Sequence, residues 1–377
     1  MGKGMKVLFL VFHSLSAHSG ISKKILAQVK GLRQCGAEAD LCCLKIFEDG
    51  SKGRTVTDAE GNETVICRFG YGLKAKLRKR ADYSDIVSYV QKGGYGLVYI
   101  RYDINADPFT IALVRKLEGL GVRVVVEIPT FPYDGEFKGQ GLLMNLQLLL
   151  DKISRKSFFS HVDNIVLYSG PSELWGCPVI HISNGIDFDN VGLARHGAAK
   201  PDGTPLKLLS VANIHLWHGL DRLIAGMAAH KETACELHIV GDGLPQIIES
   251  YRVMAKELGI ADKVKILGPM YGEALDKEFE WADLAVGSLG RHRSGIASIK
   301  TLKNREYAAR GLGFFYSETD EDFDNAPYVL KIPADESPVD VNALESFYRT
   351  QVSKMDPAQI RKSIEHLSWT RQMSAIL

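Results

Sequence analysis

A charged stretch lies at residues 298–316, where a helical pattern leads through a glycine-containing turn into an apolar strand. Its side chains suited to contact an anion or a sugar are Lys300, Lys303, Arg305 and Glu306. Cations near a helix start, beside a glycine-containing loop, can form an anion-binding site. The alternative is a solvated helix face with ion pairs three residues apart, and taken alone the stretch favours this alternative.

Two loops in the second half of the chain could contact a ligand. The first consists of Gly241, Asp242 and Gly243. It directly follows an expected strand at 236–240, where glycines let a ligand approach the backbone, although an ordinary strand-to-helix turn has the same composition. The second loop, residues 213–219, places His218 at the start of the next expected helix. Neither His215 nor His218 has a third metal ligand nearby, so we predict no zinc site there.

Carboxylates flank the proline-containing loop at 129–133, which follows the strand expected at 122–128. They are Glu127, Asp134 and Glu136. Buried carboxylates at the carboxyl end of a strand could act in acid–base chemistry or bind sugar hydroxyls. Loop solvation and turn capping explain them equally well.

These residues lie within an alternation of strands and helices. The chain begins with a continuous apolar strand at 6–12, a helix at 21–34 and a second strand at 39–44, which is the unit of a parallel sheet. The pattern repeats to residue 182 and starts again with a strand at 206–211. We therefore predict an α/β protein with two doubly wound, Rossmann-like halves. Ligands of such sheets bind at the carboxyl ends of the strands, here in the cleft between the halves.

The composition is that of an ordinary soluble globular protein. The chain has 377 residues, 45% hydrophobic and 24% charged, and its net charge of +1 gives no indication of a nucleic-acid partner. Its six cysteines show no C-x-x-C spacing, which favours free thiols in a reducing compartment. The apolar run 7–12 is too short to span a bilayer, so we expect a cytoplasmic protein. A basic run at 74–80 and the apolar helix expected at 142–150 leave open a peripheral contact with anionic lipid.

Several segments, taken in order, resemble the GT-B glycosyltransferases, and most closely the retaining family 4 enzymes. The matching segments are 19–24, 184–187, 210–224, 237–243 and 369–373. The resemblance implies an acceptor-side domain at 1–183 and a nucleotide-sugar domain at 184–357, with a C-terminal helix, about 358–377, that crosses back to the first domain. It also implies transfer of a sugar from a nucleotide-sugar, for which we expect a UDP-sugar, to a glycan or lipid-linked acceptor in surface-polysaccharide synthesis.

The resemblance also assigns roles within the charged stretch, which aligns with the family's E-x7-E region. Glu306 falls on the second glutamate, which binds the ribose hydroxyls, whereas Ser298 replaces the first. The arginine and lysine that usually contact the diphosphate fall on Asn213 and His218. Because no D-x-D metal motif is evident, other protein cations must stabilise the leaving diphosphate. The replacements that we predict are Lys300, Lys303 and Arg305, with backbone amides around Ile299. A protonated His218 would add a charge and make activity depend on pH near neutrality.

The sequence-based site therefore has two groups of residues. Those predicted to act in catalysis are Glu127, Asp134, His218 and Lys303. Those predicted to bind the nucleotide-sugar are Gly20, Asn213, Gly241, Asp242, Gly243, Ser298, Ile299, Lys300, Arg305 and Glu306. We predict no metal and no cofactor besides the nucleotide-sugar co-substrate. The alternatives are a catalytically inactive GT-B protein that binds a sugar nucleotide, a sugar-nucleotide epimerase and, more weakly, a dinucleotide dehydrogenase.

Overall fold

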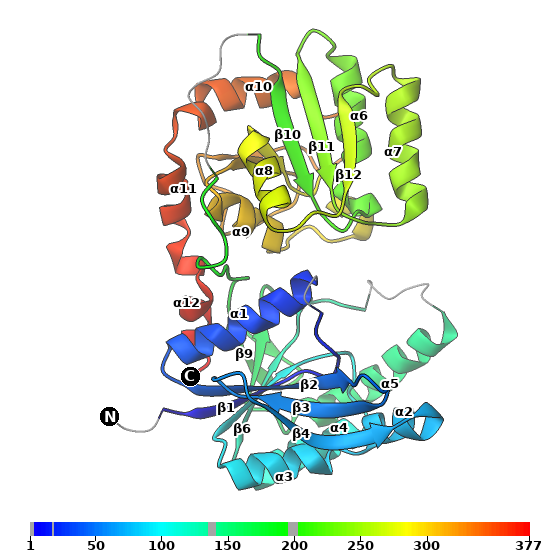
Figure 1. The fold of residues 1–377 in the computed structure, drawn as a ribbon, viewed down its shortest axis with the longest axis vertical. Coiled ribbons are helices and arrows are strands. Elements are labelled where there is room, and N and C mark those ends of the chain that lie inside the picture. The colour runs from blue at the N-terminus through cyan, green and yellow to red at the C-terminus, as the bar shows by residue number, and fades with distance from the viewer. Residues whose placement is uncertain (1–3, 17–18, 135–140, 195–202) are drawn as a thin grey trace. The chain divides into compact units, whose positions relative to one another are not determined.

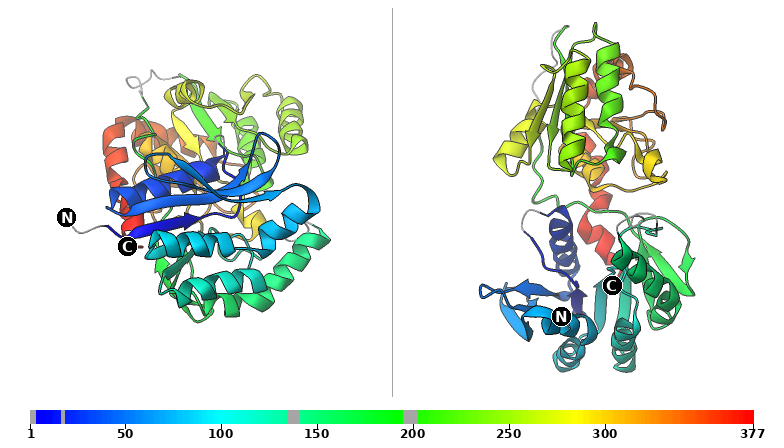
Figure 2. Two further views of the ribbon diagram at one scale, coloured as in Figure 1. Left: turned by 60° about the horizontal axis from the view of Figure 1, so that its bottom comes forward. Right: turned by 90° about the vertical axis from the view of Figure 1, so that its right-hand side faces the viewer.

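The computed structural model describes residues 4–16, 19–134, 141–194 and 203–377. The chain divides into two compact units (Figure 1). Unit 1 comprises Met1–Gly185 and Ser368–Leu377, and unit 2 comprises Ile186–Leu367. In each unit, helices cover both faces of a mainly parallel sheet (Figure 2). This confirms the predicted class of an α/β protein with two Rossmann-like halves.

The described strands of unit 1 form one sheet in the order β4-β3-β2-β1-β5-β6-β7-β9-β8. Their bounds are β1 (Lys6–Leu10), β2 (Glu38–Ile46), β3 (Lys52–Thr57), β4 (Glu63–Gly70), β5 (Leu97–Arg101), β6 (Arg123–Glu127), β7 (Asn164–Leu167), β8 (Glu173–Leu174) and β9 (Cys177–His181). The strands from β2 to β9 in this order run parallel, and β3 and β4 extend the sheet as an antiparallel pair. The apolar β1 and β5 are buried on both faces, as their continuous apolar sequences require.

The helices of unit 1 lie on the two faces of this sheet. On one face, α3 (Ser84–Gly93), α4 (Pro108–Gly119) and α5 (Leu142–Phe159) cover the core, and α2 (Gly72–Ala81) follows β4. On the other face, α1 (Gly20–Gln34) lies against α12 (Trp369–Ser374) (Figure 1). A Cβ at Gly31 would lie 2.7 Å from the Trp369 carbonyl oxygen, and the Cys35 thiol donates to the Thr370 carbonyl at 3.1 Å. The last helix of the chain is therefore part of unit 1.

The described strands of unit 2 form a parallel sheet in the order β12-β11-β10-β13-β14-β15. Their bounds are β10 (Leu206–Val211), β11 (Cys235–Val240), β12 (Val264–Gly268), β13 (Leu284–Val286), β14 (Gly313–Tyr316) and β15 (Val329–Lys331). The helices are α6 (Leu220–Ala229), α7 (Pro245–Glu257), α8 (Glu273–Trp281), α9 (Leu302–Ala309), α10 (Val341–Thr350) and α11 (Pro357–Ser363), with short 3₁₀ turns η1 (Leu216–His218), η2 (Arg291–Ser294), η3 (Val352–Lys354) and η4 (Glu365–Leu367). One apolar cluster packs α6, α7 and α10 on one face, and a second packs α8, α9 and α11 on the other.

Two local predictions change. The sequence pattern does not reveal the antiparallel strand β3 or the helix α2, because the sequences of both are polar and lack an apolar repeat. The helix expected from residue 298 begins only at Leu302. The preceding residues are extended instead, because the Ile299 N–H donates to the Thr319 carbonyl at 2.9 Å and the Thr319 N–H donates to the Ala297 carbonyl at 2.7 Å.

Three further findings bear on the sequence-based expectations. Among the described residues, no helix has the length and apolar character needed to cross a membrane. All six cysteines are free thiols. Within the same residues, no three His, Cys, Asp or Glu side chains are grouped so that they could hold a metal ion.

Each sheet has a point at which the strand order reverses. In unit 1 the chain builds outward from β1 to β2 and then continues on the other side with β5. In unit 2 the same reversal occurs between β10 and β13. Ligands of open α/β sheets bind beside the carboxyl ends of the strands at such a reversal. The fold therefore favours a ligand site at the loops after these four strands.

Candidate functional site

The loops that follow β10 and β13 are hydrogen-bonded to each other. The Leu289 N–H donates to the His218 carbonyl at 3.0 Å, and the Gly290 N–H donates to the Trp217 carbonyl at 3.2 Å. Gly219 has a φ of +62°, and a Cβ there would lie 2.7 Å from the Gly290 nitrogen. Glycine is therefore required at this position, and the two loops form one rigid edge.

Arg222 in α6 holds this edge in place. Its buried guanidinium donates to the carbonyls of Leu289, Pro333 and Ser337, the last at 2.8 Å. A cation with so many fixed acceptors is a structural anchor. It positions the loop after β13 without being available to a ligand.

The glycines after β11 are needed for a similar reason. Gly241 has a φ of +137°, and a Cβ there would come within 1.7 Å of the Ala212 carbonyl oxygen. A Cβ at Gly243 would lie 2.5 Å from the Ile214 carbonyl oxygen. Asp242 between them is exposed, and its carboxylate accepts from the Gly243 N–H at 2.8 Å. The glycines thus allow the ends of β10 and β11 to approach, and they leave backbone and Asp242 facing solvent.

A buried amine and a buried carboxylate lie at the same edge. The Lys303 Nζ atom, from the first turn of α9, is buried and has no hydrogen-bond partner among the described residues. Glu318, two residues beyond β14, is 2% exposed, and neither of its carboxylate oxygens has a partner within the described residues. Burial lowers the pKa of Lys303 to about 7, against the opposing effect of Glu318, and Arg291 lowers it further. Burial raises the pKa of Glu318 to about 7, against the effect of Lys303.

His218 lies close enough to Lys303 for the lysine to affect the pKa of the His218 ring. Burial lowers the pKa of His218 well below its usual value, and the nearby cations Lys303 and Arg291 lower it further. Its Nδ1 accepts the His215 N–H at 3.0 Å, so the neutral ring carries its proton on Nε2. This corrects the expectation of a protonated His218, because burial among cations disfavours a second positive charge. His218 is a neutral hydrogen-bond donor.

An aromatic side chain lies next to these groups. The rings of Trp217 and His215 stack with centroids 4.1 Å apart, and the Arg291 guanidinium lies 5.2 Å from the centre of the Trp217 ring. Arg291 opens the short turn η2, directly after the edge formed by Gly290. The turns η1 and η2 therefore bring a second cation to the edge where Lys303 and His218 lie.

Two of the predicted phosphate ligands have other partners. Arg305 is fully buried and forms ion pairs with Asp320 and Asp322, so the structure contradicts its predicted contact with the donor. Its guanidinium cannot reach a ligand without breaking these buried pairs. Lys300 lies 3.7 Å from a Glu321 oxygen and 3.6 Å from an Asp322 oxygen. It remains partly exposed, but its charge is shared with two acids.

The remaining predicted residues of unit 2 lie at or near the edge. Asn213 and Ser298 are exposed, and Ile299 is half-buried beside the strand-like contact with Thr319. Glu306 is partly exposed and accepts from Arg310 Nε at 3.1 Å. Its position on α9 leaves part of the carboxylate open to solvent, which suits a contact with a hydroxyl.

Glu127 in unit 1 is inaccessible to solvent and saturated with partners. Its oxygens accept from Arg101 (2.6 Å), Gln28 (2.7 Å), Tyr168 (2.8 Å) and Tyr99 (2.9 Å), and Lys24 lies 3.3 Å away. Burial acts to raise its pKa, but Lys24 and Arg101 outweigh burial and hold the pKa at about 2. This geometry contradicts the predicted acid–base role, because a carboxylate in such a network neither takes up a proton near neutral pH nor touches a substrate.

Asp134 and Gly20, also in unit 1, differ from Glu127 in exposure. Asp134 is half-buried and pairs with Arg155 at 3.1 Å and with Lys152 at 3.3 Å. Burial acts to raise the pKa of Asp134, but these cations hold it below its usual value. Gly20 is the exposed first residue of α1, and a Cβ there would meet open space, so the fold does not require glycine at this position. Glu136, which the sequence analysis named together with Asp134, lies outside the described residues.

The structure thus joins two predicted residues, His218 and Lys303, with two that the sequence did not single out, Arg291 and Glu318. Arg291 lies in the segment Arg-His-Arg-Ser, which has the composition of a solvated loop. Glu318 is the first of several acids between 318 and 324. Its place directly after an apolar strand is the signal that could have identified it.

Comparisons with known proteins give one kind of match. No family model and no curated protein matches the sequence. Among solved structures, sucrose-phosphate synthase from Thermosynechococcus elongatus matches with a TM-score of 0.65 at 15% identity, over 99% of this chain and 98% of that one. HepE from Anabaena in complex with UDP matches with a TM-score of 0.60 at 13% identity, over 99% of both chains. A glycosyltransferase from Rickettsia africae matches with a TM-score of 0.62 at 12% identity, over 98% of this chain and 96% of that one.

These neighbours cover both units from end to end. The chain has the GT-B glycosyltransferase fold. At 12–15% identity the likeness shows the fold alone. Membership of family 4 and a retaining mechanism therefore stay predictions.

Proposed function

We propose that the protein is a glycosyltransferase that binds a UDP-sugar on unit 2 and transfers the sugar to an acceptor bound by unit 1. The observation that carries the proposal is the buried Lys303 amine, which lacks a hydrogen-bond partner among the described residues and lies at the strand-order reversal of a Rossmann-like sheet. HepE, a neighbour in fold, has been solved with UDP and with UDP-glucose. Both observations support a nucleotide-sugar donor.

The chemistry needs positive charge where a nucleoside diphosphate leaves. The bond from the anomeric carbon to the diphosphate oxygen breaks with its electron pair going to that oxygen, the acceptor oxygen bonds to the anomeric carbon, and the proton of the acceptor hydroxyl passes to the leaving diphosphate. Lys303 and Arg291 supply cations for the diphosphate, and the His218 Nε2–H supplies a neutral donor. These three groups take the place of the arginine and the lysine that the resemblance leads one to expect at positions 213 and 218. On this proposal no metal ion is needed to neutralise the leaving group.

Glu318 adjusts the charge of the amine. Because Lys303 and Glu318 each have a pKa of about 7, the pair is close to losing a proton at neutral pH. An incoming diphosphate favours the protonated amine, so donor binding is accompanied by proton uptake. Glu306, partly exposed on the same helix, is the residue that we propose for the ribose hydroxyls.

Thermal unfolding of the full chain with a ligand panel tests the proposal. UDP, UDP-sugars, GDP-sugars, dTDP-sugars and NAD are compared at equal concentration, since a ligand that binds the native state raises the melting temperature. We expect stabilisation by UDP and by at least one UDP-sugar, and slow release of free sugar from that donor. Stabilisation by NAD alone would refute the proposal. The anomeric configuration of the product, read by NMR, tests whether the transfer is retaining.

A peripheral contact with an anionic membrane surface belongs to the same proposal. The outward face of α5 exposes a helical stripe of apolar side chains: Leu142, Leu143, Leu146, Leu149, Leu150 and Ile153. The basic helix α2 lies near α5, since Lys76 of α2 and Gln147 of α5 line one pocket. An apolar helix face beside cations suits a surface of anionic lipid.

Vesicle sedimentation checks this contact. We expect the protein to sediment with phosphatidylglycerol vesicles and to stay in solution with phosphatidylcholine vesicles. Replacing Leu142 and Leu143, which are 88% and 87% exposed, by Ser should abolish sedimentation without changing the melting temperature. Unchanged sedimentation of the double variant would remove α5 from the proposal.

A further inference from the structure

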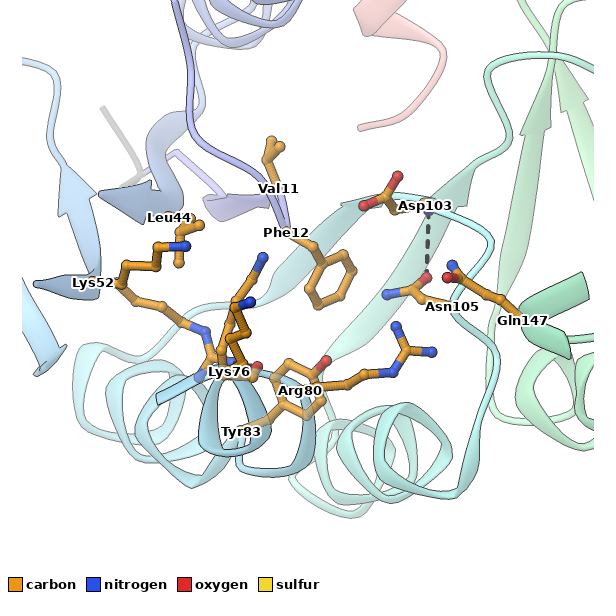
Figure 3. A pocket seen from close by; sticks show the side chains of 12 residues that line it. Val11, Phe12, Leu44, Lys52, Lys76, Arg80, Tyr83, Asp103, Asn105 and Gln147 are labelled. Atoms are coloured by element: carbon orange, nitrogen blue, oxygen red, sulfur yellow. Dashed lines mark hydrogen bonds between the residues drawn. The ribbon is translucent and has the colours of Figure 1, made fainter. Parts of the chain in front are cut away.

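Unit 1 contains a pocket of about 340 Å³ at the strand-order reversal of its own sheet (Figure 3). Val11 and Phe12 line it directly after β1, and Asp103 and Asn105 line it after β5. These two strands are the pair between which the order reverses. The pocket therefore has the position at which open α/β sheets bind their ligands.

The lining of the pocket is strongly basic. Its cations are Lys52, Arg54, Lys76, Lys79 and Arg80. Figure 3 shows Lys52 and Lys76 on one side of the pocket and Asp103, Asn105 and Gln147 on the other, with the Arg80 side chain extending between the two sides. Asp103 is the one carboxylate among the described residues that line it. The charge inside the pocket is therefore clearly positive, although the whole chain carries a net charge of only +1.

Two of these cations are fixed by the fold. Arg54 is buried, pairs with Asp85 at 2.6 Å and donates to the carbonyls of Asp82 (2.8 Å) and Lys79 (2.7 Å). Arg80 lies 3.2 Å from Asp107, the residue that caps α4. Both arginines have partners of their own. They shape the pocket and contribute to its positive electrostatic potential. Because of these partners, they offer few free hydrogen-bond donors to a ligand.

The three lysines differ from the arginines. Lys52, Lys76 and Lys79 form no ion pair with a carboxylate in the part of the chain that the structure describes. Burial lowers the pKa of Lys79, and Lys52, Arg54 and Arg80 lower it further against the effect of Asp103. The cations therefore repel one another, and an anion placed between them would relieve this repulsion.

The other side of the pocket suits a sugar. Phe12 and Tyr83 pack edge to face, with ring centroids 5.7 Å apart, and both line the cavity. The amides of Asn105 and Gln147 lie opposite Lys52 and Lys76 (Figure 3). Aromatic faces pack against the apolar face of a sugar ring, and amides can pair with hydroxyls.

We propose that this pocket binds the acceptor through a phosphate group, with Lys52 and Lys79 as its main ligands. The inference rests on the proposed function and adds the chemical class of the acceptor. Lysines act as mobile point charges, which suits a phosphate better than the planar fork needed for a carboxylate. The phosphate belongs to a sugar phosphate or to a lipid-linked sugar diphosphate.

Calorimetric titration of the full chain tests this inference. Saturating UDP is present throughout, so that the diphosphate site of unit 2 is filled. The probes are glucose 6-phosphate, glucose, and farnesyl diphosphate as a soluble lipid diphosphate. We expect at least one phosphorylated probe to bind about tenfold or more tightly than glucose, and the preferred probe identifies the source of the phosphate.

Matched variants assign the binding to the pocket. Replacing Lys52 and Lys79 by Ala should weaken the preferred probe about tenfold or more, and should leave UDP binding unchanged. Replacing Lys116, an exposed lysine of α4 outside the pocket, by Ala should change neither affinity. Because the removed lysines repel their neighbours, the double variant should melt at the same temperature as the unaltered chain or higher.

Two results would overturn the inference. One is equal affinity for glucose and both phosphorylated probes. The other is phosphate binding that survives in the Lys52 and Lys79 double variant. A failure of UDP to bind at all would instead refute the proposed function, and phosphate binding measured without UDP would still report on the pocket.

Discussion

Among the described residues, each unit has one buried glutamate at or just beyond the carboxyl end of a strand, and the two are in opposite states. Glu127, at the end of β6, has five polar partners and a pKa of about 2. Glu318, beyond β14, has no hydrogen-bond partner among the described residues and a pKa of about 7. Burial is the largest influence on both, but only Glu127 has enough cations and donors to overcome it.

The difference separates a structural carboxylate from a functional one. A satisfied buried charge helps to fix the core of unit 1 and has no capacity left for chemistry. An unsatisfied acid next to an unsatisfied amine gains when a ligand arrives, because the ligand supplies the missing partners. Burial and position in the sheet alone do not distinguish the two cases.

Replacing Glu127 by Gln should give the largest effect. It leaves Lys24 and Arg101 buried without their counter-charge, so we expect a loss of about 3–5 kcal/mol in the free energy of unfolding at pH 7. Because the folded pKa lies below the ordinary value, the stabilisation is present above about pH 4.5 and is lost as pH falls toward 2. The difference from the unaltered chain, measured by urea unfolding, should therefore shrink from pH 5 downward. Glu318→Gln, the matched control, should change the free energy of unfolding by less than about 1 kcal/mol. A comparable loss of stability in both variants would contradict the difference drawn between the two glutamates.

Replacing Lys303 by Met should reduce UDP affinity by about 10–100-fold, because a charged hydrogen bond to the diphosphate is lost. The melting temperature without ligand should not fall, since an apolar side chain of similar length replaces an amine that burial disfavours. Isothermal titration calorimetry measures the affinity. Undiminished UDP binding would mean that the diphosphate lies elsewhere.

The affinity for UDP should fall as pH rises from 6 to 8. Both Lys303 and Glu318 lose a proton near pH 7, so the site becomes less positive as pH rises and attracts the diphosphate less. The slope should not exceed about tenfold per pH unit for each proton. In Lys303→Met the slope should be much smaller. A slope of the opposite sign would contradict the role of the pair.

Replacing Lys300 by Ala should have the smallest effect. This lysine already shares its charge with Glu321 and Asp322, so we expect UDP affinity to change by no more than about threefold. The same calorimetric titration compares it with Lys303→Met. Equal losses in the two variants would show that the buried amine has no special role.

The fold was largely accessible from the sequence, because continuous apolar strands and 3.6-residue helical repeats report directly on a parallel sheet. Lys303 and His218 could be named as candidates from the sequence, His218 from its place after a strand and Lys303 from the charged start of a helix. The protonation states of Lys303 and His218 could not be predicted from the sequence. The neutral state of His218 follows from burial and from two cations that approach it from other segments of the chain.

The sequence also does not show which of several neighbouring charged side chains are already paired within the fold. Arg305 and Lys303 are two residues apart on α9, yet Arg305 is paired with Asp320 and Asp322, whereas the buried Lys303 amine has no hydrogen-bond partner among the described residues. The acids that make this difference follow β14 in a run, and their order alone does not say which is paired. Only the packing of the loop after β14 against α9 decides it.

The packing of α12 on α1 has a consequence for synthesis of the chain. Trp369 fills space beside Gly31 and Gly185, where a Cβ would clash with it at 2.7 and 2.5 Å. All of these residues belong to unit 1, but Trp369 is translated after the whole of unit 2. Although domains generally fold in the order of their synthesis, the first unit to emerge from the ribosome is here the last to be completed. A chain that stops before Ser368 would therefore leave unit 2 whole and expose the core of unit 1.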